Sequence, residues 1–170
     1  MKFLYGICLF LALNTVGFAQ NTATTTETTT YYLIRHAEKD TSDPNNRNPH
    51  LTEEGQVRAL NWSKIFEHID FDAVYSTQYH RTIETATPTA KSKNLEIQFY
   101  DPRNMDYQEF KKTNSGRTVL IVGHSNSTPT FVNAIIGKKK YETIDESING
   151  NLYIISITDD TSVDQVLSIN

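Results

Sequence analysis

Short apolar runs alternate with longer amphipathic stretches along most of the chain. This alternation is typical of a largely parallel sheet whose strands are connected by helices packed on both faces. We therefore expect an α/β fold, a three-layer α/β/α sandwich with a mainly parallel central sheet. The predicted strands cover residues 31–35, 73–76, 95–99, 118–122 and 152–157.

The longer stretches carry the signals of helices. Thr52 is a suitable N-cap, because its hydroxyl can accept a hydrogen bond from a free backbone N–H, and the two glutamates after it favour the positive end of a helix. Helical spacing predicts the apolar face of this helix at Val57, Leu60, Ile65 and Ile69. Further helices are predicted over residues 79–92, 105–112 and 128–136, the last one ended by Gly137.

The N-terminal segment is predicted to be a targeting signal. Lys2 precedes an apolar run at residues 3–13, and two small residues, Gly17 and Ala19, follow. This order is typical of a secretory signal peptide cleaved after Ala19. The run is shorter than the roughly 20 apolar residues of a membrane-spanning helix, so we expect no membrane anchor in the mature protein. The predicted organisation is a signal peptide at 1–19, a threonine-rich polar leader at 20–30 and one domain at 31–170.

Composition excludes several kinds of site and partner. The only cysteine, Cys8, lies inside the predicted signal, so the mature protein would have no thiolate nucleophile, thiolate zinc site or disulfide. The formal net charge is −4, and it becomes −5 when Lys2 is removed with the signal. An acidic chain of this kind offers no electrostatic footprint for nucleic acid. We expect a mildly acidic protein in the periplasm or outside the cell.

Three polar clusters follow predicted strands. They cover residues 35–38, 76–85 and 123–126. Ligands collect at the carboxyl ends of strands in open α/β sheets, so these clusters are expected to converge although they lie far apart in sequence. Residues 39–50, which are rich in proline and asparagine and show no apolar periodicity, are predicted to form a surface loop at the rim of this site.

The side chains in the clusters suit a phosphate dianion. Arg35 and Arg81 offer planar, permanently charged forks that match phosphate oxygens, and the helix expected after Asn126 adds backbone N–H groups at its positive end. His124 adds a donor if it is protonated. His36 then remains as the nucleophile, because a neutral imidazole can carry a phosphoryl group that water later hydrolyses.

At these residues the chain resembles the histidine phosphatase superfamily, also called phosphoglycerate-mutase-like, and most closely its short SixA-like branch. Residues 32–38 (YLIRHAE) look like the family's signature at the end of its first strand, and residues 51–55 (LTEEG) resemble the helix start that follows. The second motif is matched by Tyr75-Ser76, Arg81 and Thr85-Ala86, and the closing motif by residues 122–125 (VGHS). Four motifs in register make the resemblance specific.

The resemblance implies roles for these residues. His36 would be the nucleophile, Arg35 and Arg81 the phosphate clamps, and His124 a stabiliser of transition-state charge. The general acid would be Asp101, with Asp106 and Glu38 as rivals. No metal or other cofactor is implied, and the substrate would be a phosphorylated small molecule or a phosphorylated macromolecule.

Other interpretations fit less well. A serine hydrolase built on Ser125 would need a histidine later in the chain, and His124 is the last one, so Ser125 is expected to help cap the next helix. A zinc deaminase would need a Pro-Cys-x-x-Cys motif that is absent. A mutase is disfavoured because the chain shows no lid insertion. A non-catalytic phospho-ligand binding module remains as the alternative. The other histidines, His50, His68 and His80, are expected to be solvated.

Overall fold

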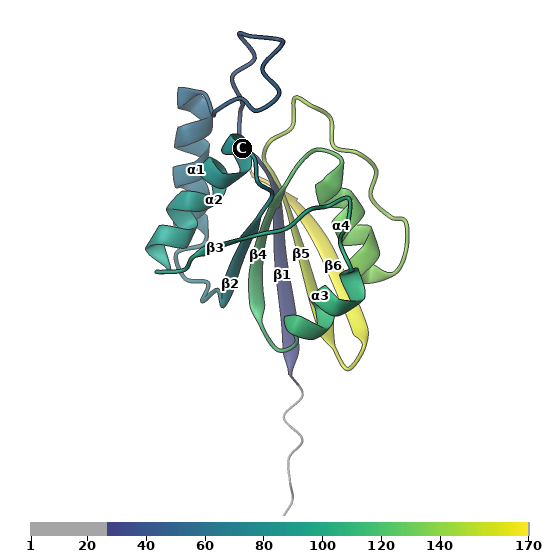
Figure 1. Cartoon of the computed structure of the whole chain (residues 1–170). Coiled ribbons are helices and arrows are strands. Elements are labelled where there is room, and N and C mark those ends of the chain that lie inside the picture. Colours follow the sequence, from purple (N-terminus) through teal and green to yellow (C-terminus); the bar gives the residue numbers. More distant parts are fainter. Residues whose placement is uncertain (1–26, 170) are drawn as a thin grey trace, which may run out of the picture.

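The computed structural model describes residues 27–169, so the predicted signal peptide, Cys8 and most of the predicted leader lie outside the described residues. A single six-stranded sheet forms the centre of this part of the chain, with the strand order β3-β2-β4-β1-β5-β6 (Figure 1). The strands are β1 (Thr28–Arg35), β2 (Ala73–Ser76), β3 (Ile97–Phe99), β4 (Thr118–Gly123), β5 (Asn151–Thr158) and β6 (Thr161–Ser168). The helices are α1 (Glu53–Ile65), α2 (His80–Ser92), α3 (Tyr107–Thr113) and α4 (Ser127–Ile136).

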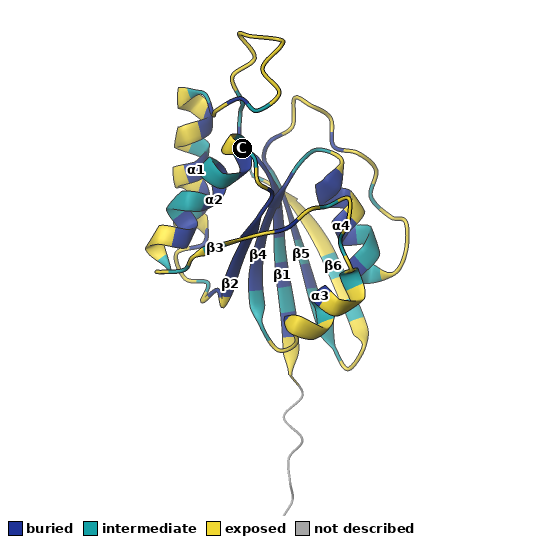
Figure 2. Ribbon diagram, in the orientation of Figure 1, coloured by how far each residue is buried: buried dark blue, intermediate teal, exposed yellow. Residues whose placement is uncertain are grey.

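The sheet is mainly parallel and lies between two helical layers, as predicted. The pairs β2–β3, β2–β4 and β1–β4 are parallel, whereas β5 is antiparallel to both β1 and β6. Successive side chains of a strand point to opposite faces, and both faces are apolar here. In β1, Leu33 packs with Phe110 of α3 and Phe131 of α4, while Ile34 packs on the other face with Trp62 of α1. The middle of the sheet is therefore buried, as Figure 2 shows.

Two strands differ from the prediction. β1 begins at Thr28, three residues earlier than predicted, so the last threonines of the predicted leader pair with β4 or β5. β6 was not predicted at all, because it is an edge strand whose sequence is polar and largely exposed. A two-residue turn joins it to β5, and both turn residues, Asp159 and Asp160, have positive φ angles. Such angles match the twist of a tight hairpin.

Helix α1 begins as predicted but buries a different face. The Thr52 hydroxyl accepts a hydrogen bond from the N–H of Gly55, at 3.1 Å. Val57 and Leu60, predicted to face the core, are 56% and 55% exposed, whereas Ala59 and Trp62 are each 1% exposed. The buried side combines Gly55 and Ala59, which lie against the chain after β1, with Trp62, which packs into the core beside Phe66. The pattern of apolar residues alone does not select this side.

The remaining predicted elements are present with small shifts at their ends. Helix α4 ends at Gly137, which has a φ of 69° and donates its N–H to the carbonyl of Asn133, as predicted for a glycine C-cap. Residues 39–50 form a mostly exposed loop at the top of the view (Figure 2). Pro49 is buried, Lys39 and Asn48 are half-buried, and a bridge between Lys39 and Leu51 closes the base of the loop. Within residues 27–169, no helix combines the length and the apolar character needed to cross a membrane.

Candidate active site

The three polar clusters meet at one edge of the sheet. The neighbouring parallel strands β1, β4 and β2 end at Arg35, Gly123 and Ser76, so the residues after them share one carboxyl edge. His36 and His124 come together there, with their ring centroids 5.4 Å apart. The predicted convergence of these clusters is confirmed.

A cavity of about 880 Å³ opens at this edge. Of the residues that the sequence predicted for the site, His36, Arg81, His124 and Asp101 line it. Arg35 does not line it. The rest of the wall comes from the segments that follow β2, β3 and β4, together with Lys39 and a residue of the loop before β5.

His36 is buried at this edge, and hydrogen bonds hold its backbone in place. It is 3% exposed. Its backbone N–H donates to the carbonyl of Gly123 at 2.9 Å, and its carbonyl accepts from the side-chain amide of Asn149 at 2.9 Å. The next N–H, that of Ala37, donates to the hydroxyl of Thr85 at 2.9 Å. These contacts join β1 to β4, to α2 and to the segment before β5, and they leave His36 little freedom.

The orientation of the His36 ring identifies its free nitrogen. Nδ1 lies 2.7 Å from the carbonyl oxygen of Ala37. A carbonyl oxygen only accepts, so Nδ1 must carry the proton in this hydrogen bond. In a neutral imidazole the lone pair is then on Nε2. Nε2 is therefore the ring nitrogen of His36 that can accept a proton or act as a nucleophile.

Both histidines are neutral at neutral pH. Burial lowers the pKa of His36 to about 3, with smaller contributions from the positive charges of Arg35 and Arg81, although the hydrogen bond to Ala37 opposes the shift. Burial also lowers the pKa of His124 to about 4, and the charge of Arg81 adds to this effect. The predicted protonated form of His124 is therefore not the resting form. A bound phosphate dianion would favour its protonation, since an adjacent opposite charge stabilises the imidazolium.

His124 is positioned by residues after β2. Its Nε2 forms a hydrogen bond of 2.9 Å with the hydroxyl of Thr77, which forms a second one of 2.9 Å with the hydroxyl of Thr82. The ring of Tyr79 meets the His124 ring edge to face, with centroids 5.1 Å apart. The chain between β2 and α2 thus fixes the plane of the imidazole.

Arg81 is a cation of the site with donors left over. It is the second residue of α2, and its guanidinium carbon lies 4.5 Å from the centroid of the Tyr79 ring. Its Nε and Nη1 are buried without a hydrogen-bond partner among the described residues. Burial lowers the pKa of Arg81, although Tyr79 and the carboxylate of Glu146 oppose the shift. Buried donors in native structures normally have partners, and these atoms can donate to the oxygens of a bound anion.

Arg35 differs from the prediction in where its side chain lies. It is 1% exposed, and Nη1 donates to the carbonyls of Asp145, Glu146 and Ile148 at 2.9–3.0 Å. Its Nη2 contacts the carboxylate of Glu146 at 2.6 Å. In this structure Arg35 holds the loop before β5 instead of lining the cavity. The sequence could not predict this, because these partners lie about 110 residues away.

Glu146 is a cavity residue that the sequence did not predict. Its carboxylate contacts Arg35 and, at 3.5 Å, Lys39, and it accepts a hydrogen bond from the hydroxyl of Ser125. The hydrogen bond from Ser125 and the charges of Arg35 and Lys39 lower its pKa. Ser125 was expected to cap α4, but the side chain of Asn126 does so. No signal in the sequence marked Glu146, since it lies in a segment without periodicity.

The candidate general acids are all engaged in other contacts. Asp101 lines the cavity, but its carboxylate accepts from the N–H of Arg103 at 3.0 Å and from the side chain of Asn104 at 2.7 Å. These hydrogen bonds lower its pKa, the opposite of the shift that an acid requires. Asp106 caps α3 and Glu38 pairs with Arg58 at 2.7 Å, and neither lines the cavity.

Comparison with known proteins identifies the class of protein to which this fold and these motifs are similar. The fold is that of the phosphoglycerate-mutase-like α/β proteins. Residues 31–107 match the family model described as the histidine phosphatase superfamily (branch 1). That match includes Arg35, His36 and Arg81, whereas His124 lies beyond it. The resemblance to the histidine phosphatase superfamily, predicted from the motifs, is therefore confirmed.

Solved structures extend the likeness to most of the chain. A protein of Agrobacterium tumefaciens assigned as the phosphohistidine phosphatase SixA has 20% identity and a TM-score of 0.60, covering 83% of this chain and 99% of that one. The alpha-ribazole phosphatase of Shigella flexneri has 16% identity and a TM-score of 0.62, covering 82% and 96%. A mycobacterial glucosyl-3-phosphoglycerate phosphatase has 10% identity and a TM-score of 0.65, covering 84% and 99%. A sequence search among curated proteins found no significant match.

Proposed function

We propose that this protein is an exported phosphatase that hydrolyses phosphomonoesters or phosphoramidates through a phosphohistidine intermediate on His36. The observation that carries the proposal is that one cavity contains both an arginine with unused hydrogen-bond donors and a histidine with a free ring nitrogen. The buried guanidinium of Arg81 has donors without a partner, and the neutral ring of His36 has a free Nε2. A phosphoryl group would satisfy both, because its oxygens accept hydrogen bonds from Arg81 and its phosphorus can bond to Nε2 of His36.

The proposed reaction has two steps. Nε2 of His36 attacks phosphorus, the bond from phosphorus to the leaving oxygen or nitrogen breaks, and the leaving group takes up a proton from solvent. Water then attacks the phosphohistidine, the N–P bond breaks, inorganic phosphate leaves and neutral His36 is restored. Arg81 stabilises the charge on the equatorial oxygens, and His124 does so once the dianion has favoured its protonation.

The cavity also suggests the kind of substrate. It is open to solvent and lined by both aromatic and charged residues, among them Phe99, Arg81 and Arg103. A pocket of this kind accepts a phosphoryl group on carriers of varied size. The three phosphatases named above are described as acting on phosphohistidine, alpha-ribazole phosphate and glucosyl-3-phosphoglycerate, which share only the phosphoryl group.

We further propose that the reaction is independent of metal ions, because arginine and histidine perform every role assigned here. The test is phosphate release by the mature chain over a panel of phosphomonoesters and phosphoramidates with a chelator present. We expect turnover that the chelator does not change and that His36→Ala abolishes while phosphate or vanadate still binds. Binding without turnover in the unaltered chain would favour the alternative, a non-catalytic phospho-ligand module.

Export is proposed from the pattern at residues 1–19 alone. Lys2, the apolar run and Ala19 support it, and an exported enzyme would meet phosphorylated compounds outside the cytoplasm. Expression of the full chain in a bacterial host followed by fractionation and N-terminal mass analysis tests it. We expect a mature protein that begins at Gln20 in the periplasm or the medium. A chain that keeps Met1 and stays in the cytoplasm would contradict the proposal.

A further inference from the structure

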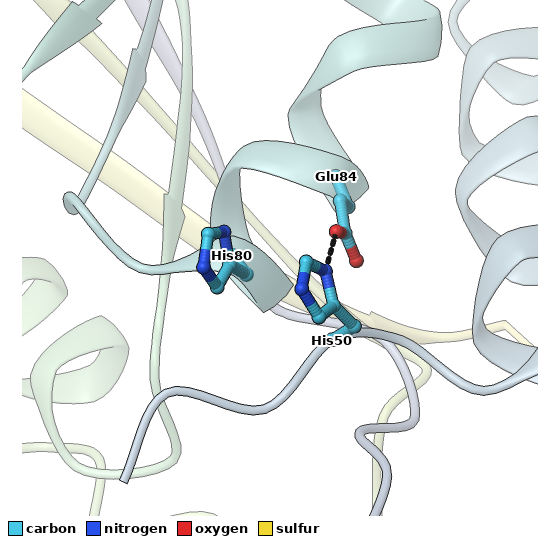
Figure 3. Close-up of side chains that lie close together, drawn as sticks. All are labelled: His50, His80 and Glu84. Carbon is cyan, nitrogen blue, oxygen red and sulfur yellow. Dashed lines mark hydrogen bonds and ion pairs between the residues drawn. The ribbon is translucent and has the colours of Figure 1, made fainter. Parts of the chain in front are cut away.

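Three side chains outside the cavity form a compact cluster of potential metal ligands. His50 lies at the end of the loop 39–50, and His80 and Glu84 lie on the first turns of α2 (Figure 3). One ligand atom from each lies within 4.8 Å of the other two. The sequence predicts that both histidines are solvated, because the loop contact that joins them is not visible from spacing.

The arrangement follows from helical geometry and from the closed base of the loop. His80 and Glu84 are four residues apart, so they project from the same side of α2. The loop brings the His50 ring against the His80 ring, with centroids 4.1 Å apart and planes at 15°. The N–H of His80 donates to the side chain of Asn48 at 2.9 Å, so a loop residue also caps the start of α2.

Glu84 is oriented by contacts that leave it able to bind an ion. One carboxylate oxygen forms a hydrogen bond with Nδ1 of His50 (Figure 3), and the other accepts from the N–H of Leu51 at 2.8 Å. Residues that bind metals commonly form an additional hydrogen bond to a neighbouring group, and this bond orients the ligand atom. The hydrogen bond from Leu51 has this role for Glu84. The carboxylate also supplies the negative charge that two neutral imidazoles lack.

We propose that His50, His80 and Glu84 bind a divalent transition-metal ion of the Zn²⁺ type. Two imidazole nitrogens and one carboxylate oxygen are ligands that suit Zn²⁺, and a water molecule would complete a tetrahedral site. Ligand atoms around Zn²⁺ lie roughly 3.3 Å apart, given metal–ligand distances of about 2.0–2.1 Å. Both histidines are exposed, so small rotations of their side chains reach this spacing.

The site would join the end of the loop 39–50 to the residue before Arg81. An ion bound there ties the loop 39–50 to the first turn of α2, from which Arg81 enters the cavity. The ion stands outside the proposed phosphoryl transfer and has no part in its chemistry. Its expected effect is to stabilise the folded chain and to order the loop.

The test is calorimetric titration of the untagged protein with Zn²⁺, combined with the visible spectrum of bound Co²⁺. We expect one site whose affinity falls by more than about tenfold in His50→Ala, in His80→Ala and in Glu84→Gln, since even a lost outer-shell contact weakens metal sites by about 10–100-fold. His68→Ala is the matched control, because His68 is exposed on another part of the surface and should bind as the unaltered chain does.

Two further readouts make the result decisive. The melting temperature should rise with Zn²⁺ in the unaltered chain and in His68→Ala but not in His50→Ala, because a ligand that binds only the folded state stabilises it. Binding that survives in both His50→Ala and His80→Ala would overturn the proposal, as would no binding in the unaltered chain. Neither result bears on the phosphatase proposal, whose test is run with a chelator present.

Discussion

The reactivity proposed for His36 depends on one short contact within the chain. Its Nδ1 proton is used by the carbonyl of Ala37, so Nε2 is free, and burial keeps the ring neutral by lowering its pKa to about 3. A lowered histidine pKa means that the neutral form persists as the pH falls. We expect the ¹⁵N signals of His36 to show a protonated Nδ1 and a bare Nε2 from pH 8 down to pH 5 (about two pH units above that pKa). Titration near the ordinary histidine value of about 6.5 would contradict this assignment.

A second prediction concerns the shape of the cation at position 81. Lys in this position keeps the charge but lacks the planar fork that binds two phosphate oxygens. Arg81→Lys should therefore recover only a small part of the activity that Arg81→Ala loses. Vanadate binding to Arg81→Ala should weaken by about 2–5 kcal/mol, the range for a desolvated charge pair. Arg47→Ala, on the exposed loop away from the cavity lining, serves as control. Unchanged vanadate binding in Arg81→Ala would exclude Arg81 from the site.

The role of Asp101 is tested by comparing leaving groups. Its carboxylate is held by Arg103 and Asn104 with a lowered pKa, so we expect Asp101→Asn to affect alkyl phosphates and p-nitrophenyl phosphate by the same small factor. A general acid contributes about 10²–10⁴-fold, and only for leaving groups that need a proton. A loss of that size confined to alkyl phosphates would establish Asp101 as the acid that the sequence resemblance implies.

Among the elements, α1 shows how a helix can be predicted while its buried face is not. Thr52 and the acidic first turn are local signals, and the helix begins where they indicate. The buried face depends on the surrounding chain, which the pattern of apolar residues does not contain. A Cβ at Gly55 would lie 2.2 Å from the carbonyl oxygen of Glu38, so the helix and the chain after β1 touch through a bare glycine.

This contact leads to a stability prediction for the element. Gly55→Ala should lower the free energy of unfolding by about 1–3 kcal/mol or more, because the atom in the way belongs to the backbone and cannot turn aside. Val57→Ala, on the exposed face of the same helix, should change it by no more than about 0.5 kcal/mol. Denaturation in urea measures both. A larger effect at Val57 than at Gly55 would reverse the assignment of the two faces.

In the whole molecule, the parts of the site that the sequence predicts are those fixed by the order of the strands. His36, Arg81 and His124 follow the ends of β1, β2 and β4, and parallel pairing brings these ends together. Contacts that join distant segments cannot be predicted from the pattern of apolar and polar residues. The partners of Arg35 lie in the loop before β5, and the cluster of His50 with His80 depends on how the exposed loop folds back.

The central claim is that turnover passes through phosphorylated His36. The most direct measurement is to quench the enzyme with denaturant at high pH during turnover of a phosphate-labelled substrate and to map the label by mass spectrometry. We predict an acid-labile, base-stable phosphoryl group on Nε2 of His36, absent in His36→Ala. A label on Ser125, the hydroxyl nearest in sequence to His124, or turnover in His36→Ala at the rate of the unaltered enzyme would contradict the account.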